Sequence, residues 1–518
     1  MSALKPYLLS ISVIAIIALA ASSFAEKDNL LEKASKPNII IILADDLGYG
    51  DPEVYNPDSK IPTPNINALA KGGIRFTDAH SPSAVCTPTR YGLLTGQYAW
   101  RTALENGVLL YWDKPLIPQN RQTIASMLKE SGYNTAAIGK WHLGWLWSDT
   151  QGKYVNDTLS VMPHDQKIRQ PLADKIDFTK AIGGGPTSLG FDYYFGDDVP
   201  NYAPYAYFEN DKLLQIPNMI KPDSIFGNPG PMSSDWDLRA VMPTITEKAA
   251  SYITEQASSE NPFFLYFALT APHTPIAPAG EFQGTTKIGP YGDYVHQVDY
   301  TVGQIVKRLE ATGQLENTII IFTSDNGSPQ RDGTKMSGPV GSVKVSGHDP
   351  SKPFKGTKAD IFEGGHRVPF IVSWPGTIKN EQVNSQLFGL NDLAATLASL
   401  TGNSQKTNEF EDSRDFSKVF LGKSKKPVRE DLINHSANGS FAIRSGDWKL
   451  ILAEGSGGWT KVTAAPGEKL PPIQLYNLKN DPHEDQNLQA EYPEMVKELT
   501  QKLEKYKSQG FSNPEFSK

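Results

Sequence analysis

The chain has 518 residues, of which 39% are hydrophobic, and this allows one large core together with a smaller second unit. The formal net charge is −7 and there is no cluster of Lys and Arg, so we expect no nucleic-acid partner. Cys86 is the only cysteine, which excludes an internal disulfide.

The first 25 residues have the pattern of a secretory signal peptide. Lys5 precedes an apolar run over residues 7–21, and small residues up to Ala25 offer a cleavage site. The apolar run is too short and wrongly flanked for a stable membrane span. We therefore assign residues 1–25 to a signal peptide and expect an exported protein, periplasmic or secreted, without a stable membrane anchor.

Apolar runs predict the strands, most of them buried on both faces as in a parallel sheet. In chain order these runs occupy residues 39–43, 135–138, 263–269, 318–322 and 370–373. Helical patterns lie between them, so strands and helices alternate. Four of the runs lead directly into polar residues, and the ligands of open α/β sheets collect at the carboxyl ends of strands.

Two of these strand ends carry oxygen ligands. Asp45 and Asp46 follow the first run, and two adjacent carboxylates repel each other unless a cation lies between them. A helix-capping pair is the alternative interpretation. Asp325 and Asn326 follow the fourth run and would complete an oxygen cage, although DNG alone is compatible with a simple turn. An oxygen cage favours a hard cation, Ca2+ with Mg2+ possible.

Cys86 begins the stretch CTPTRYGLLTG, in which Arg90 lies one helical turn further on. A thiol at a helix start beside a fixed cation is expected to have a lowered pKa and an anion site next to it. The alternative is a small buried apolar side chain, the usual role of an unpaired cysteine.

Two further strand ends carry titratable groups. Lys140 and His142 lie in GKWHLG, and two positions apart on an extended chain they point the same way. A cation and an imidazole on one face suit an oxyanion with a proton to move. His273, in PHTP, follows another strand, where a histidine is as often structural as catalytic.

These stretches together resemble the signatures of type I sulfatases of the alkaline phosphatase superfamily. The resemblance implies that a formylglycine-generating or sulfatase-maturating enzyme oxidises Cys86 to Cα-formylglycine, whose hydrate is the nucleophile. It also implies the remaining roles. The implied metal ligands are Asp45, Asp46, Cys86, Asp325 and Asn326, and the implied catalytic residues are Cys86, Arg90, Lys140, His142, His273 and Lys358.

Lys358 is assigned as the sulfate-binding lysine by its distance in sequence from Glu363. The resemblance implies a sulfate-binding lysine five residues before the Glu of an EGG turn, and counting back from Glu363 gives Lys358. Lys355 is the alternative. His366, which follows the same turn, is open between a substrate contact and a hydrogen-bonded support.

The order of elements predicts the architecture. Alternating strands and helices favour a mainly parallel α/β sheet covered by helices, and the resemblance implies the alkaline-phosphatase-like fold for a catalytic domain over residues 36–428. A hairpin over residues 441–452, a strand at 474–478 and a helix at 492–506 predict a small C-terminal α+β subdomain with an antiparallel sheet over residues 429–518.

The predicted function is hydrolysis of sulfate esters on a sulfated carbohydrate such as an algal polysaccharide, a glycosaminoglycan or a mucin glycan. Loops rich in aromatic residues between about 145 and 239 would shape the specificity. Two alternatives stay open: a phosphate or phosphonate monoester hydrolase of the same superfamily, and a non-catalytic protein that binds sulfated glycans. No pattern in the sequence predicts the oligomeric state.

Overall fold

The computed structural model describes residues 36–157, 166–333, 341–464, 466–467 and 469–517. The predicted signal peptide lies outside these residues. Asn38–Lys518 form one unit by their contacts. No helix among the described residues is long and apolar enough to cross a membrane.

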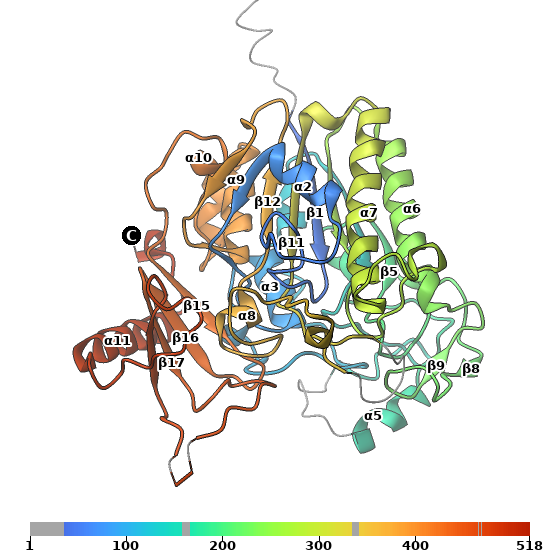
Figure 1. Ribbon diagram of the computed structural model, residues 1–518. Coiled ribbons are helices and arrows are strands. Elements are labelled where there is room, and N and C mark those ends of the chain that lie inside the picture. The colour runs from blue at the N-terminus through green and yellow to red at the C-terminus, as the bar shows by residue number, and fades with distance from the viewer. Residues whose placement is uncertain (1–35, 158–165, 334–340, 465, 468, 518) are drawn as a thin grey trace, which may run out of the picture. The chain divides into compact units, whose positions relative to one another are not determined.

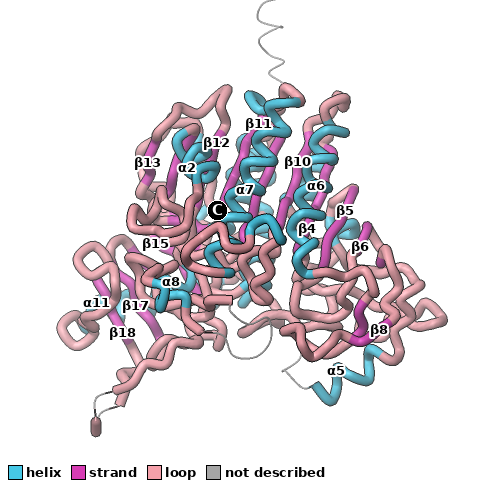
Figure 2. The backbone as a smooth tube through the Cα atoms, turned by 45° about the vertical axis from the view of Figure 1, so that its right-hand side comes forward, coloured by secondary structure: helices cyan, strands magenta, loops and turns pink. Residues whose placement is uncertain are grey.

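A ten-stranded sheet runs through the larger part of this unit (Figures 1 and 2). In spatial order its strands are β13 (Gln382–Asn384), β2 (Gly73–Phe76), β12 (Phe370–Ser373), β11 (Thr318–Ser324), β1 (Asn38–Ala44), β10 (Phe263–Ala268), β4 (Asn134–Lys140), β5 (Tyr193–Asp197), β6 (Phe208–Glu209) and β7 (Lys212–Leu213). The five strands from β11 to β5 are parallel to one another, whereas the pairs β11–β12, β12–β2, β5–β6 and β6–β7 are antiparallel. The predicted mainly parallel α/β sheet is therefore confirmed, with mixed edges.

β1 lies at the centre of the sheet because its run of isoleucines can be buried on both faces. Ile39 is paired with Phe264 of β10 on one side and with Ile319 of β11 on the other. All of the strand from Ile39 onwards is buried. The carboxyl ends of β1, β10, β11 and β4 consequently meet at one edge of the sheet.

Two groups of helices accompany the sheet. α2 (Pro64–Lys71), α7 (Pro290–Ala311) and α6 (Leu238–Gln256) pack side by side over one face (Figure 2). α3 (Cys86–Thr95), α4 (Ile124–Glu130) and α9 (Leu393–Leu400) pack against one another as a second group. Three shorter helices are α5 (Gln166–Ala173), α8 (Glu363–His366) and α10 (Ser417–Phe420). Two small ladders join β3 (Ala79–His80) to β14 (Phe388–Gly389) and β8 (Met219–Ile220) to β9 (Pro231–Met232).

The C-terminal part forms the predicted antiparallel sheet, shown in orange and red in Figure 1. Its strands, in spatial order, are β15 (Asp431–His435), β16 (Phe441–Ser445), β17 (Trp448–Leu452) and β18 (Gln474–Asn477), and α11 (Pro493–Gln509) packs against β16 and β17. Gly446 turns the β16–β17 hairpin with φ of 55°, which glycine adopts without strain. The boundary between residues 428 and 429 stays a prediction.

Candidate active site

Asp45 and Asp46 leave the sheet at the carboxyl end of β1. Asp46 has a left-handed backbone, with φ of 70°. Its N–H donates to Asp325 Oδ1 at 3.1 Å, and the next N–H, of Leu47, donates to Ser324 Oγ at 2.9 Å. The end of β11 thus holds the end of β1, and the two carboxylates after β1 lie beside the Asp325 carboxylate and the Asn326 amide after β11.

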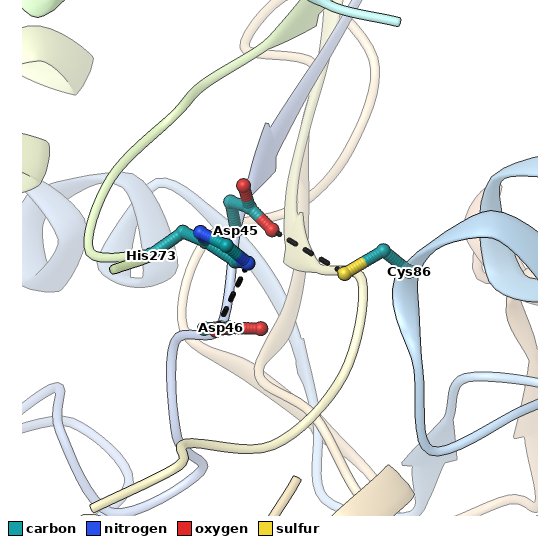
Figure 3. A group of neighbouring side chains, drawn as sticks. All are labelled: Asp45, Asp46, Cys86 and His273. Atoms are coloured by element: carbon teal, nitrogen blue, oxygen red, sulfur yellow. Dashed lines mark hydrogen bonds and ion pairs between the residues drawn. The ribbon is translucent and has the colours of Figure 1, made fainter. Parts of the chain in front are cut away.

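Four side chains of types that can ligate a metal converge at this point (Figure 3). Asp45, Asp46, Cys86 and His273 each offer a donor atom, and these atoms lie within 4.8 Å of one another. Cys86 Sγ is 3.8 Å from Asp45 Oδ1, and His273 Nε2 is 3.8 Å from Asp46 Oδ2. The buried side chains of Asp325 and Asn326 border the same cluster through their contacts with Asp46.

The donor set fits a hard divalent cation. Asn326 Nδ2 donates to Asp46 Oδ1 at 2.7 Å, whereas Asn326 Oδ1 is buried and has no hydrogen-bond partner among the described residues. A buried carbonyl oxygen without a donor costs free energy unless a cation or water reaches it. Carboxylate and amide oxygens are the ligands that Ca2+ and Mg2+ prefer, so the residues present would accept either ion.

Three buried cations hold these carboxylates. Lys140 Nζ donates to both oxygens of Asp45, at 3.0 and 2.8 Å. Arg90 donates to Asp325 Oδ2 from Nε at 3.1 Å and from Nη2 at 2.7 Å. Each acid is thereby fixed by a charge-assisted hydrogen bond, the stronger class of hydrogen bond in proteins.

Lys358 is the third of these cations and contacts both an acid and the thiol. Its Nζ lies 2.7 Å from Asp46 Oδ1 and 3.3 Å from Cys86 Sγ. Lys355, the alternative, points elsewhere, because its Nζ donates to Glu484 O at 3.0 Å. His366 is buried in a separate cluster, where its Nδ1 lies 3.0 Å from His80 Nδ1, so it supports the fold and does not line the pocket.

The prediction of a lowered thiol pKa is wrong. Cys86 does begin α3, but burial raises the pKa of the thiol to about 12, and the negative charge of Asp325 adds to the effect. Arg90, one turn further on, is already paired with Asp325. The helix start and the cation therefore do not stabilise a thiolate as they would in an exposed site.

Burial and neighbouring charges shift the pKa values of Asp45 and Asp325 in opposite directions. Burial raises the pKa of Asp45 to about 8, even though Lys140 opposes the shift. Burial would also raise the pKa of Asp325, but the charges of Arg90 and Lys140 outweigh it and hold that pKa below its usual value. A cation between the carboxylates would favour the ionised form of both.

The two histidines are oriented by backbone carbonyls. His142 Nε2 lies 2.9 Å from Leu109 O and His273 Nδ1 lies 2.6 Å from Thr274 O, and because a carbonyl only accepts, each of these nitrogens carries the proton. His142 Nδ1 is buried without a partner among the described residues. Burial, together with the nearby lysine charges, holds the pKa of both rings well below the usual range.

The residues around His142 differ from the sequence expectation. His142 has φ of 57°, so Lys140 and His142 do not lie on an extended chain. Asp198 fixes the turn by accepting from His142 N at 3.2 Å and from Trp145 Nε1 at 3.0 Å. Asp198 follows β5, in a stretch for which the sequence predicts loops, so no predicted strand end pointed to this acid.

A pocket of about 480 Å3 opens from this cluster. Asp46, Cys86, His142, His273 and Lys358 lie at one part of its lining. The rest of the lining comes from segments far apart in the chain and includes Tyr202, Phe226, Arg331, Asn438 and Trp459. None of the latter was predicted individually, because loops without periodicity give no signal for which side chains meet.

Comparison with known proteins identifies the family. A family model described as "Sulfatase" matches residues 37–403. The chain belongs to the sulfatase family. A second model, "N-sulphoglucosamine sulphohydrolase, C-terminal", matches residues 357–509 of the sulfatase. The resemblance found in the sequence is thereby confirmed, and the sulfatase is a sulfuric ester hydrolase.

Relatives cover nearly the whole sulfatase. It is 34% identical over 505 residues to an N-acetylgalactosamine-6-O-sulfatase of Bacteroides thetaiotaomicron, covering 93% of this chain and 95% of that protein. It is 32% identical over 496 residues to arylsulfatase A of Bos taurus, covering 91% and 87%. A solved structure from work on the metabolism of multiple glycosaminoglycans by Bacteroides thetaiotaomicron superposes with a TM-score of 0.76 at 31% identity, covering 92% and 100%. The fold is accordingly alkaline-phosphatase-like.

Proposed function

We propose that this sulfatase hydrolyses sulfate esters of a sulfated carbohydrate, using a formylglycine hydrate at position 86 and a divalent cation, Ca2+ with Mg2+ possible. The observation that carries the proposal is the buried cluster in which Cys86 Sγ lies beside Asp45 and Lys358 at the lining of a pocket. The carbohydrate is supported by the N-acetylgalactosamine-6-O-sulfatase to which the chain is similar.

A bound cation and the modified residue at position 86 would supply part of the chemistry. A cation bound by Asp45, Asp46, Asp325, Asn326 and the group at position 86 would polarise the sulfate and its nucleophile. A formylglycine hydrate at position 86 would offer one hydroxyl to attack sulfur and a second whose deprotonation lets sulfate leave.

The chain's own cations would bind and orient the sulfate. Lys358 Nζ reaches both the pocket and position 86, so it can neutralise a sulfate oxygen beside the nucleophile. Lys140 and Arg90 are fully buried and bound to Asp45 and Asp325. We therefore infer that these two residues fix the acidic ligands and the charge balance, and that Lys358 contacts the substrate.

The two histidines would move protons at defined atoms. His142 Nδ1 carries a lone pair without a partner, because Nε2 donates to Leu109 O, so Nδ1 can accept a proton from position 86. His273 Nε2 must first gain a proton before it can donate to the leaving alcohol, and an anionic sulfate in the pocket favours that protonation. The two rings would thus serve opposite directions of proton transfer.

We further propose that residues 1–25 direct export and that a formylglycine-generating or sulfatase-maturating enzyme modifies Cys86.

Two measurements on protein from its own host test the proposal. The peptide that spans Cys86 should have the lower mass of an aldehyde in place of the thiol. The protein should release sulfate from N-acetylgalactosamine 6-sulfate or another sulfated sugar faster than phosphate from the matched phosphate ester, because a phosphate dianion needs more positive charge. An unmodified thiol in fully matured protein, or faster phosphate release, would contradict it; binding of sulfated glycan without any release would favour the non-catalytic alternative.

A further inference from the structure

Beyond the cluster around Cys86, the pocket has a second cationic position. Arg331 lines the pocket together with Phe226 and Trp459. The Arg331 guanidinium lies 5.6 Å from the centroid of the Trp459 ring and 6.0 Å from that of Phe226. Both distances are within the range of cation–π contacts, so the two rings hold the side chain in place.

The charge of Arg331 is not neutralised within the described residues. There the guanidinium forms no ion pair and no hydrogen bond, whereas Arg90, Arg101, Arg367 and Arg429 each pair with a carboxylate. Guanidinium N–H groups form a planar fork that matches an oxyanion. An arginine that is held by rings and has its fork free is suited to bind an anionic ligand group.

The two rings sit on loops that are themselves anchored. Asp360 Oδ1 accepts from Trp459 N at 2.8 Å and from Thr460 N at 2.9 Å, which ties the Trp459 loop to the segment that carries Lys358. Lys221 Nζ donates to Pro222 O at 2.9 Å and to Ile225 O at 2.6 Å, which closes the turn before Phe226. The position is therefore built before a ligand arrives, which lowers the entropic cost of binding.

Trp459 also connects this position to the proposed sulfate site. Lys358 Nζ lies 5.8 Å from the Trp459 ring centroid, and Arg331 contacts the same ring. Trp459 is 54% exposed. Because both cations contact the same ring, one sugar unit or two neighbouring units can reach both of them while a sugar face packs on the indole.

We propose that Arg331, held between Phe226 and Trp459, binds a second oxyanion of the substrate, on the sulfated sugar or on the sugar next to it. The shared chemistry is a carboxylate or a second sulfate, and the substrate class is a saccharide with at least two negative charges. This inference rests on the proposed function, because it assumes that the first sulfate occupies the position beside Lys358 and Cys86.

The test compares saccharides that differ in the second anion alone. The probes are the unsaturated chondroitin 6-sulfate disaccharide, the same disaccharide with its carboxylate reduced to an alcohol, and N-acetylgalactosamine 6-sulfate beside the 4,6-disulfate. Sulfate release gives kcat/KM for the wild type, Arg331→Gln and Arg331→Lys. In parallel, calorimetry gives the affinity of each probe for the Cys86→Ala variant with and without Arg331→Gln, so the subsite is tested even if no sulfate is released.

We expect the wild type to prefer the probe with the second anion, and Arg331→Gln to reduce that preference by about 10- to 100-fold, the usual effect of losing a hydrogen bond to a charged group. Arg331→Lys should retain part of it. A preference for the carboxylate identifies a uronate as the anion, and a preference for the disulfate identifies a second sulfate.

Arg75→Gln is the matched control. Arg75 also lies over a ring, 5.3 Å from the Tyr55 centroid, but it does not line the pocket, so this variant should keep the wild-type preference. Two results would overturn the proposal: equal preferences in the wild type and Arg331→Gln, or a wild type that favours neither anion. Absence of sulfate release with the affinity contrast intact would instead contradict the proposed hydrolysis.

Discussion

Lys358 and Lys355 are three residues apart, yet the structure gives them separate surroundings. Lys358 contacts Asp46 and Cys86 inside the pocket, whereas Lys355 donates to the backbone of Glu484 and lies 4.7 Å from the Phe362 ring centroid. The two lysines therefore form a matched pair in which one is proposed to meet the substrate and the other ties two loops together.

We expect Lys358→Ala to lower kcat by about 100- to 1,000-fold, the effect typical of removing one preorganised donor to a developing negative charge. Lys355→Ala should lower the unfolding temperature and leave kcat within about threefold, because Lys355 acts on the fold. Steady-state sulfate release and thermal unfolding of both variants provide the measurement. An equal loss of kcat in the two variants would contradict the assignment of Lys358.

The proposed metal ligands should make the stability of the protein depend on calcium. Calcium added to chelator-treated protein should raise the unfolding temperature, because an ion that binds the folded state alone stabilises it by mass action. Asn326→Ala should weaken the calcium affinity by about 10- to 100-fold, since its unpartnered Oδ1 would be lost.

The shift in unfolding temperature against calcium concentration, with magnesium titrated alongside, measures that affinity. Glu491→Gln, at an exposed carboxylate, is the control and should titrate as the wild type. A wild type whose unfolding temperature responds to neither ion would argue against a metal at this place.

At the scale of elements, Tyr98–Arg101 join the catalytic part to the C-terminal sheet. The Tyr98 ring belongs to the core of that sheet and its hydroxyl accepts from Ile433 N at 3.2 Å. Arg101, in the 3-10 turn Ala99–Arg101, forms a two-point pair with the buried Asp412 and donates to Tyr506 O of α11 at 2.9 Å. This short segment thus contacts both Asp412, which precedes the C-terminal sheet in the chain, and α11, the last α-helix.

Arg101→Ala should destabilise the protein by about 3–5 kcal/mol, because it leaves the Asp412 carboxylate buried without its partner. Denaturant unfolding followed by tryptophan fluorescence measures the loss, with Arg75→Gln as the control. A change of less than about 1 kcal/mol would show that the pair does not hold the two parts together.

A second contact between elements predicts a pH dependence. Burial raises the pKa of Glu484 to about 7, against the opposing charge of Lys449, which lies 2.8 Å away. Because the folded pKa is above the ordinary 4.5, the protonated acid stabilises the fold; this contribution is full below about pH 4.5 and is lost as the pH rises through about 7.

Glu484→Gln should therefore flatten the fall in unfolding temperature between about pH 5 and pH 8. The amide can still accept from Glu363 N, which now donates to Glu484 Oε2 at 2.7 Å. Thermal unfolding at several pH values measures the slope. A slope in the variant as steep as in the wild type would exclude Glu484 as its source.

The strands were predictable because their apolar runs are continuous, and a polar residue after such a run has to lie at a sheet edge. The expectation that Asp45, Asp46 and Asp325 meet follows from this, and their side chains do lie together. The turn at His142 and the environment of Cys86 were not predictable. Both depend on residues from distant segments of the chain. For Cys86, burial by those residues is the main cause of the raised thiol pKa.

At the scale of the whole molecule, the pocket is completed by residues from both the large sheet and the C-terminal part. Ala437, Asn438, Gly458 and Trp459 line it from beyond residue 428. Lys449 of β17 also lies 3.0 Å from the buried Glu363 of α8. The predicted boundary at 428/429 therefore does not separate two independent functions.

We expect a chain that ends at residue 428 to yield no soluble, folded protein, because Glu363 would lose Lys449 and the core around Tyr98 would be exposed. Soluble yield and near-ultraviolet circular dichroism provide the measurement. A chain that lacks residues 1–25 is the control and should fold. A folded, soluble fragment over residues 26–428 would disprove the dependence.

The contact between Lys358 and Cys86 can form only after both residues have been synthesised. The two residues are 272 positions apart in the chain. At about 5–20 residues per second, the ribosome needs on the order of tens of seconds to pass from one to the other. For that interval the thiol cannot be covered by Lys358 or by anything after it, so the enzyme that we propose to modify Cys86 would meet an uncovered thiol.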